Sequence, residues 1–141
     1  MGTSSFGLPA LKKLVDNNFN VVAVYTQPPR PAGRGKKITL SPIGQFATNQ
    51  NLNVLHPENF TDENDIYNFQ NLKADLVIVV AYGLILPARL LAAEKVSFFN
   101  IHASILPRWR GAAPIQRALL MGDSETGVCI INLERSLDTG P

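Results

Sequence analysis

The sequence has a single cysteine, no long apolar run and almost no excess charge. Cys129 has no second cysteine for an intrachain disulfide, and its apolar surroundings favour a buried core residue over a catalytic thiol. The longest aliphatic run, 76–81, is far shorter than the ~18 residues of a membrane-spanning helix. Thr3, Ser4 and Ser5 stand where a signal peptide needs basic and long apolar segments. These absences exclude a disulfide scaffold and favour a cytoplasmic or organellar-matrix protein.

The bulk composition is that of one soluble globular domain. The 141 residues are 45% hydrophobic and 17% charged, which is enough apolar material for one core and argues against disorder. The net charge of +2 is weak evidence for any partner, but it is unevenly spread. Four of the thirteen basic residues fall within eight positions, and no carboxylate occurs between Asp16 and Glu58 to offset them. That basic segment calls for an explanation of its own.

Short apolar runs alternate with amphipathic segments, a pattern typical of repeated βα units. We expect buried strands over 21–26, 76–81, 96–101 and 128–133, because these runs are rich in Val, Ile and Phe. Spacing at Leu8, Leu11 and Leu14 predicts a first helix, and Ser41-Pro42 predicts the start of a second. Three more helices are expected from about 61, over 87–93 and from 114 towards the glycine at 122. The fold class is therefore α/β, with a mainly parallel, Rossmann-like sheet flanked by helices.

The residues at both ends of the sequence indicate that it contains only part of a domain. Residues 2–7 form a turn-like segment that leads into a helix, without the apolar strand that normally feeds such a turn. At the other end the chain stops in a loop just after the fourth expected strand. We therefore expect residues 1–141 to be one domain that lacks its first strand and its carboxyl-terminal region, and to be inactive alone.

Chemistry-bearing residues gather where the third expected strand ends. Period two places Asn100 and His102 on one face, so an amide donor and an imidazole point towards the same space. Acyl transfer to an amine needs a donor for the developing oxyanion and a group that moves the amine proton, and these two side chains suit both tasks. The alternative is that they only cap the strand end and satisfy loop backbone.

The run Asn100-x-His102, followed by Ser104-x-Leu106-Pro107-x-x-x-Gly111, resembles the signature region of the folate-dependent formyltransferases. In that family a later Leu-Asp-Thr-Gly loop supplies an aspartate, and residues 137–140 match it. The resemblance implies that Asn100 and His102 stabilise an oxyanion and that Asp138 holds the imidazole and assists proton transfer. Without the resemblance, Asp138 reads as an ordinary turn residue before Thr-Gly.

The resemblance also implies a formyl donor, 10-formyl-tetrahydrofolate, and two loops that contact it. One loop follows the catalytic strand, and the other resembles the family's second pterin-side loop. The implied contact residues are Ser104, Ile105, Leu106, Pro107, Tyr82 and Gly83. Plain turns would use the same residues. No metal is expected, because no Cys, His or carboxylate cluster has ligand spacing.

The basic segment, residues 27–37, resembles a loop found in those members of the family that formylate a charged initiator tRNA. Its cations are Arg30, Arg34, Lys36 and Lys37. Cations on a Pro and Gly framework can follow phosphates, with an affinity that falls with salt. Pro29 departs from the usual acidic residue of this loop. The resemblance thus implies initiator tRNA as the partner of a monomeric enzyme, while composition alone fits a solvated surface loop.

Two alternatives remain open at this point. One is a formyltransferase whose acceptor is a small amine, such as an amino sugar or glycinamide ribonucleotide, for which the basic segment is dispensable. The other is a non-catalytic RNA-binding domain on a Rossmann-like scaffold. It predicts RNA affinity that survives loss of Asn100 and His102, and no folate binding.

Overall fold

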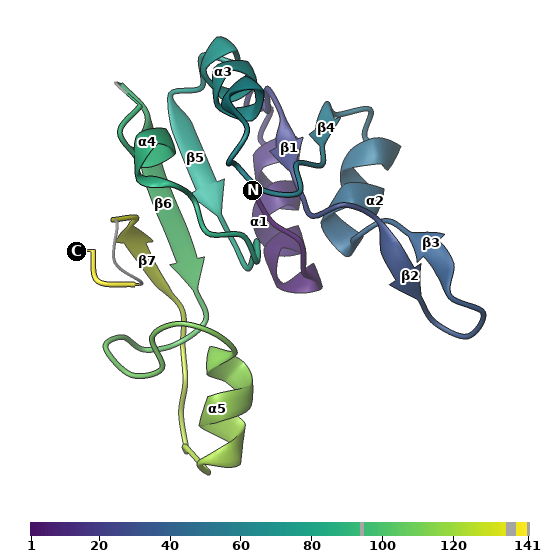
Figure 1. Cartoon of the computed structure of the whole chain (residues 1–141). Coiled ribbons are helices and arrows are strands. Elements are labelled where there is room, and N and C mark those ends of the chain that lie inside the picture. The colour runs from purple at the N-terminus through teal and green to yellow at the C-terminus, as the bar shows by residue number, and fades with distance from the viewer. Residues whose placement is uncertain (94, 135–137, 141) are drawn as a thin grey trace.

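The computed structural model describes residues 1–93, 95–134 and 138–140 and shows short strands interleaved with helices (Figure 1). In chain order the elements are η1 (Ser5–Gly7), α1 (Leu8–Asp16), β1 (Val24–Tyr25), β2 (Arg30–Ala32), β3 (Lys37–Thr39), α2 (Pro42–Asn49), β4 (Val54–Leu55), α3 (Glu63–Asn71), β5 (Leu76–Val79), α4 (Ala88–Leu91), β6 (Ser97–His102), α5 (Pro114–Leu120) and β7 (Cys129–Asn132). All four expected strands and all five expected helices have an observed counterpart. The predicted α/β class is confirmed.

The strands stand in the order β4, β1, β5, β6, β7, with the first two residues of the chain between β1 and β5. β1 pairs with β4 and β5 pairs with β6, both in parallel. The Gly2 amide donates to the Tyr25 carbonyl at 2.8 Å, and the Val80 amide donates to the Met1 carbonyl at 2.9 Å. Gly2 also forms a parallel bridge with Val80. Residues 1 and 2 therefore occupy a strand position at the centre of the row (Figure 1).

Parallel pairing brings the carboxyl ends of β5 and β6 to one edge, where Val79 lies opposite Asn100. The last strand is different, because β7 runs antiparallel to β6 with His102 opposite Cys129. The described sheet is thus parallel at its centre and antiparallel at this border. Its chemistry-bearing edge is formed by the end of β6 and the start of β7.

The predicted helix starts are confirmed by their caps. The Ser41 hydroxyl accepts from the Gly44 amide at 2.9 Å, and Pro42 occupies the first turn of α2. The Asp62 carboxylate accepts from the Asn64 amide at 2.8 Å at the start of α3. Gly122, with φ of 68°, follows α5 in the left-handed conformation that glycine adopts freely.

Two apolar clusters lie on opposite sides of β1, because successive residues of a strand point to opposite faces. Val24 packs with Leu11, Ile43 and Ala47 of α1 and α2. Tyr25 packs on the other side in a larger cluster from α3, α4, β5 and β6, whose members include Phe60, Phe69, Val77, Tyr82, Leu90 and Phe98. The helices therefore cover both faces, as the sequence pattern predicts for a parallel sheet.

Two features were not predicted from the sequence. β4 is a two-residue strand in a stretch with no apolar run, so periodicity gives no signal for it. The basic segment, expected as a loop, forms an antiparallel hairpin in which Pro31 lies opposite Ile38. The hairpin can contain Pro31 because both of its strands are exposed and each has only one partner. We call β2, β3 and their turn the basic hairpin.

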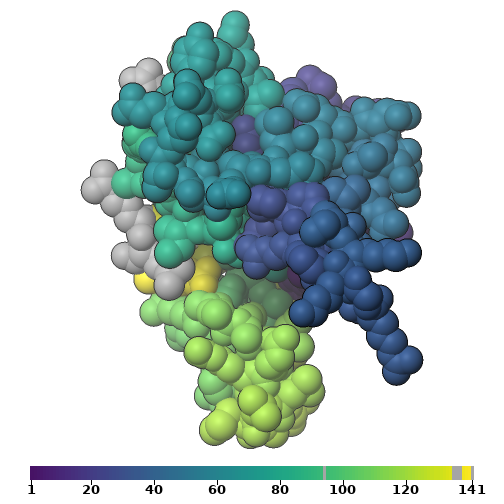
Figure 2. Space-filling model, turned by 45° about the vertical axis from the view of Figure 1, so that its right-hand side comes forward, coloured from purple at the N-terminus to yellow at the C-terminus, as the bar shows by residue number. Residues whose placement is uncertain are grey.

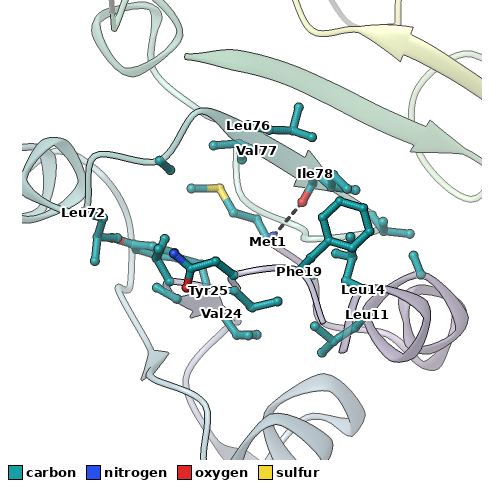
Figure 3. A pocket seen from close by; sticks show the side chains of 18 of the residues that line it. Met1, Leu11, Leu14, Phe19, Val24, Tyr25, Leu72, Leu76, Val77 and Ile78 are labelled. Atoms are coloured by element: carbon teal, nitrogen blue, oxygen red, sulfur yellow. Dashed lines mark hydrogen bonds between the residues drawn. The ribbon is translucent and has the colours of Figure 1, made fainter. Parts of the chain in front are cut away.

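A cavity of about 470 Å³ lies between β1 and β5, beside the first residue of the chain (Figure 3). Its lining includes Met1, Phe19, Ala23, Tyr25, Leu76 and Ile78. The Met1 ammonium donates to the Ile78 carbonyl at 2.7 Å, and burial lowers the pKa of this amino group to about 5. We call this cavity the central slot. It continues the strand position that residues 1 and 2 occupy.

Candidate active site

The end of β6 directs the two predicted catalytic side chains to one carboxylate. The Asn100 amide donates to Asp138 Oδ1 at 2.9 Å, and His102 Nδ1 lies 3.5 Å from Asp138 Oδ2. Period two in β6 places Asn100 and His102 on the same face, as expected. The structure therefore brings together all three residues of the predicted trio, although Asp138 lies 38 positions beyond Asn100.

Two of the three residues are shielded from water, and Asn100 is half-buried. His102 is 6% exposed and Asp138 is 8% exposed. Asp138 adopts a left-handed φ of 50°, and its Oδ2 accepts a further hydrogen bond from the Gly111 amide at 2.8 Å. The N–H groups of Asn100 and Gly111 thus hold the Asp138 carboxylate beside the imidazole. Burial lowers the local dielectric, so the electrostatic interaction between the carboxylate and the imidazole is stronger than it would be in water.

The second ring nitrogen of His102 is also occupied. His102 Nε2 lies 2.9 Å from the carbonyl oxygen of Trp109, which is an acceptor only, so Nε2 carries the hydrogen of this bond. Nδ1 faces Asp138 Oδ2, which is also an acceptor, so the ring donates to both oxygens only when both of its nitrogens carry hydrogen. The shorter of the two contacts, at Nε2, is the better hydrogen bond, so Nδ1 is the candidate nitrogen for proton transfer.

The expected folate loop after β6 is tightly held at its first residue. Ser104 is fully buried, and its hydroxyl donates to the Arg108 carbonyl at 2.6 Å. The Leu106 amide donates to Cys129 Sγ at 3.4 Å. Ile105, in contrast, is 49% exposed. The loop therefore presents an apolar side chain to solvent from a fixed backbone. We call the carboxyl end of β6, this loop through Gly111, and Asp138 the catalytic edge.

The second expected folate loop contributes backbone rather than the tyrosine side chain. Tyr82 is 2% exposed and packs in the larger core cluster. Its carbonyl accepts from Thr3 Oγ1 at 2.7 Å and from Gln27 Nε2 at 3.2 Å. Gly83 has φ of 83°, and a Cβ at this position would collide with the Gln27 side chain. Glycine is therefore required here, whereas the Tyr82 ring does not reach solvent.

The predicted tRNA-binding cations are all exposed on the basic hairpin and make no ion pair among the described residues. The turn of the hairpin is closed by the Lys36 amide, which donates to the Gly33 carbonyl at 3.3 Å. The hairpin and α5 both project from the end of the molecule at which β5 and β6 finish (Figure 1; Figure 2). The cations are thus separate from the trio but belong to the same end of the molecule.

Sequence reasoning missed the groups that hold the trio. The Gly111 amide and the Trp109 carbonyl are backbone atoms, so no residue type signals them. Asp123 accepts hydrogen bonds from Arg108 and Trp109, yet in the sequence it is an unremarked acidic residue after a helix. Leu137, which opens the expected Leu-Asp-Thr-Gly loop, lies outside the described residues. No cluster of three or more potential metal ligands occurs among residues 1–93, 95–134 and 138–140.

The sequence model of the formyl transferase family matches residues 1–141. The chain is 55% identical over 139 residues to the methionyl-tRNA formyltransferase of Hydrogenovibrio crunogenus, covering 99% of this chain and 45% of that protein. It is 51% identical over 140 residues to the enzyme of the same name from Hahella chejuensis, covering 99% of this chain and 44% of that protein. The chain thus spans about half the length of the curated relatives it matches.

Solved structures with the same fold have more distant sequences. A phosphoribosylglycinamide formyltransferase from Bacillus halodurans superposes with a TM-score of 0.77 at 20% identity, covering 99% of this chain and 73% of that one. A sugar N-formyltransferase from a Shewanella species superposes with a TM-score of 0.63 at 17% identity, covering 97% of this chain and 50% of that one. At these identities the likeness concerns the fold.

Proposed function

The chain belongs to the formyl transferase family, and from that membership we propose that it is the catalytic part of a methionyl-tRNA formyltransferase. This enzyme transfers the formyl group of 10-formyl-tetrahydrofolate to the amino group of methionyl-initiator tRNA in translation initiation. The observation that carries the proposal is the convergence of Asn100 and His102 on Asp138. The identity of 49–55% to methionyl-tRNA formyltransferases favours this acceptor over a small amine.

In the proposed reaction the methionyl amine attacks the formyl carbon, so a C–N bond forms and the carbonyl oxygen becomes an oxyanion. Asn100 uses one amide hydrogen on Asp138 and keeps the second for the oxyanion. His102 Nδ1 takes the amine proton, and the protonated ring then also stabilises the oxyanion. Asp138 holds the imidazole and stabilises its charge. Collapse breaks the bond from the formyl carbon to the folate nitrogen, which receives the proton.

The described residues fit the folate donor through two loops at one end of the sheet. Ile105 after β6 is 49% exposed and Ile85 after β5 is 85% exposed, so apolar surface is available for a flat ring. Backbone groups of residues 104–107 and 82–83 then orient the ring. In this proposal the Tyr82 side chain supports its loop from within the core, and the loop backbone contacts the donor.

Initiator tRNA is the proposed macromolecular partner, bound in part by the basic hairpin. Its Arg30, Arg34, Lys36 and Lys37 are exposed and unpaired by carboxylates among the described residues, so they are available to phosphates. The turn glycines place these cations on a protruding ribbon that can enter a groove of the tRNA (Figure 2). Each phosphate contact contributes a salt-dependent share of the affinity.

We also propose that the working enzyme contains more than this domain region. The central slot extends the strand position of residues 1 and 2, and its lining is mostly apolar. A strand that continues backwards from Met1, parallel to β1 and β5, would fill it and replace the buried ammonium by a peptide N–H. In this proposal residues 1–141 alone do not catalyse transfer.

The location proposed is the bacterial cytoplasm or an organellar matrix, and the proposed state is a monomer. The relatives about 50% identical over the aligned residues come from bacteria such as Hahella chejuensis. Among the described residues, none of the helices has the length and apolar character needed to cross a bilayer.

The test is formyl transfer in the complete open reading frame that contains this chain. Labelled 10-formyl-tetrahydrofolate is offered with charged initiator tRNA, with glycinamide ribonucleotide and with an amino sugar. We expect label on the tRNA only. Label on a small amine but not on tRNA would overturn the acceptor, and no transfer to any acceptor would leave the RNA-binding alternative.

The role of the basic hairpin is tested separately by the salt dependence of tRNA binding. Arg34→Ala should weaken binding and reduce the slope of log affinity against log salt by about one. Lys13→Ala, at an exposed position on α1, is the matched control and should change neither. An Arg34 variant that binds tRNA with the unaltered slope would remove the hairpin from the interface.

A further inference from the structure

A second carboxylate, Asp123, accepts hydrogen bonds from two residues of the loop after β6. Its Oδ1 accepts from Arg108 Nη2 at 2.7 Å, and its Oδ2 accepts from Arg108 Nε at 2.9 Å and from Trp109 Nε1 at 2.6 Å. The Arg108 guanidinium also lies 4.3 Å from the centre of the Trp109 ring. Hydrogen bonds from Arg108 and then Trp109 lower the pKa of Asp123 to about 2, so this carboxylate is ionised at neutral pH. We call Arg108, Trp109 and Asp123 the clamp.

The clamp is needed because apolar packing does little to hold this part of the chain. Only Ala118 of α5 is buried, while Leu119 and Leu120 are 76% and 85% exposed. The Asp123 amide donates to the Ala118 carbonyl at 3.0 Å, which ties the carboxylate to the end of α5. The polar contacts of Asp123 therefore join α5 to the loop after β6.

Trp109 of the clamp is hydrogen-bonded through its carbonyl to His102. Trp109 has a left-handed φ of 61°, which non-glycine residues rarely adopt unless their surroundings hold them there. In this conformation its carbonyl lies 2.9 Å from His102 Nε2, while its indole is held by Asp123. Trp109 thus connects Asp123 to the imidazole: its side chain is bound by Asp123 and its backbone carbonyl is bound to His102.

We propose that Asp123 is a positioning residue for His102, which it orients through Trp109. By fixing the indole, Asp123 keeps the Trp109 carbonyl 2.9 Å from Nε2, which favours hydrogen on that nitrogen and holds the ring with Nδ1 beside Asp138. The proposal rests on the proposed function for its kinetic consequence, but the tautomer of His102 can be observed without any reaction.

The first test is nitrogen NMR of the imidazole rings in the 141-residue chain at alkaline pH. The chain has two histidines, so a His56→Gln variant assigns both rings. We expect the unaltered chain to show the tautomer with hydrogen on Nε2. Asp123→Ala should shift the His102 signals towards a mixture of tautomers, and Asp123→Asn, which keeps one acceptor oxygen, should give an intermediate shift. Glu125→Ala, an exposed carboxylate two positions away, should leave them unchanged.

The second test is steady-state kinetics in the complete enzyme. Asp123→Ala should lower kcat on the order of 10- to 100-fold with little change in KM, because the substrates still bind while the base is misaligned. Trp109→Phe, which removes the indole N–H and leaves a smaller ring beside Arg108, should act in the same direction, and the double variant should fall short of the product of the two effects.

Unmoved His102 signals in folded Asp123→Ala and Asp123→Asn variants would overturn the proposal, even if activity fell, because the clamp would then act on structure alone. Signals that shift in a protein that transfers no formyl group would uphold the positioning of His102 and overturn the proposed function instead.

Discussion

The catalytic edge and the central slot lie on the same row of strands and are built in opposite ways. At the catalytic edge almost every polar group is matched: Asp138 receives N–H donors from Asn100 and Gly111, and both His102 nitrogens face oxygen atoms. In the central slot the Met1 amino group is buried against apolar walls and donates to the Ile78 carbonyl. The edge is thus organised for chemistry as it stands, whereas the slot is underfilled.

The contacts of the catalytic edge and the lining of the central slot involve different residues. The trio is supported by β6, which pairs with β5 and β7, and by the loop that follows β6. The slot affects stability, because an empty apolar space raises the free energy of the folded state and burial disfavours the protonated form of the amino group.

The largest expected effect is at the catalytic edge. His102→Ala in the complete enzyme should lower kcat by about 10³-fold, since it removes both the proton acceptor and an oxyanion donor. His56→Ala is the control, because His56 lies in another part of the chain. Transfer rates measured under single turnover decide the matter, and a His102 variant that retains activity within tenfold contradicts the assigned role.

The next effect belongs to the central slot and depends on pH. Burial lowers the pKa of the Met1 amino group from 8.0 to about 5, so between these values the unfolded chain binds more protons than the folded one. This group therefore makes stability rise with pH from 5 to 8, by roughly 4 kcal/mol in all, with no further change below 5 or above 8.

Urea unfolding of the 141-residue chain at several pH values measures this slope. Acetylation of the amino terminus removes the titrating group, so the acetylated chain should lose this component and retain that of the carboxylates. Equal slopes for both chains would show that the amino group is solvated, and the contrast between the two regions would weaken.

A smaller effect should follow from breaking the hydrogen bonds of the catalytic edge. Asp138→Ala leaves the Asn100 amide and the Gly111 amide without their acceptor, at a cost of about 1–3 kcal/mol in unfolding free energy. Asp138→Asn retains acceptor capacity and should cost less. Thermal or urea unfolding compares the two, and equal stability of the Ala variant and the unaltered chain would mean that water replaces the carboxylate.

The smallest effect is expected from Tyr82, whose ring packs in the core and whose hydroxyl has no hydrogen-bond partner among the described residues. Tyr82→Phe removes a buried unpaired hydroxyl, so stability should be unchanged or rise by up to ~1 kcal/mol. A loss of more than that, measured by urea unfolding, would reveal a partner for the hydroxyl.

Much of the architecture is predictable from local patterns. The strands at 76–79 and 97–102 are predictable because they coincide with apolar runs, and the start of α2 is predictable from the Ser41 cap and Pro42. β4 and the basic hairpin are not predictable in this way. β4 is too short to show a period, and the hairpin is held by its turn and by cross-strand backbone bonds rather than by apolar alternation.

The residues of the candidate site also differ in how far local sequence patterns predict them. That Asn100 and His102 share one face is predictable, because they lie two positions apart in one strand. Asp138 is readable only by resemblance, because nothing in its own turn points to a strand 38 positions earlier. The Tyr82 ring shows a different limit: the sequence does not reveal that this side chain is buried in the core, which leaves the backbone of residue 82 for the predicted donor contact.

The sequence by itself therefore determined the fold class, the helix starts, and the placement of Asn100 and His102 on one face at the end of β6; their predicted role in acyl transfer came from the family resemblance. Only the tertiary structure decided that Asp138 meets both of them, that the Trp109 carbonyl occupies His102 Nε2, that Asp123 grips Trp109, and that the first two residues stand at the centre of the strands. The reason is physical: periodicity and capping act within a few residues, whereas these contacts depend on strand order and on backbone groups that every residue carries.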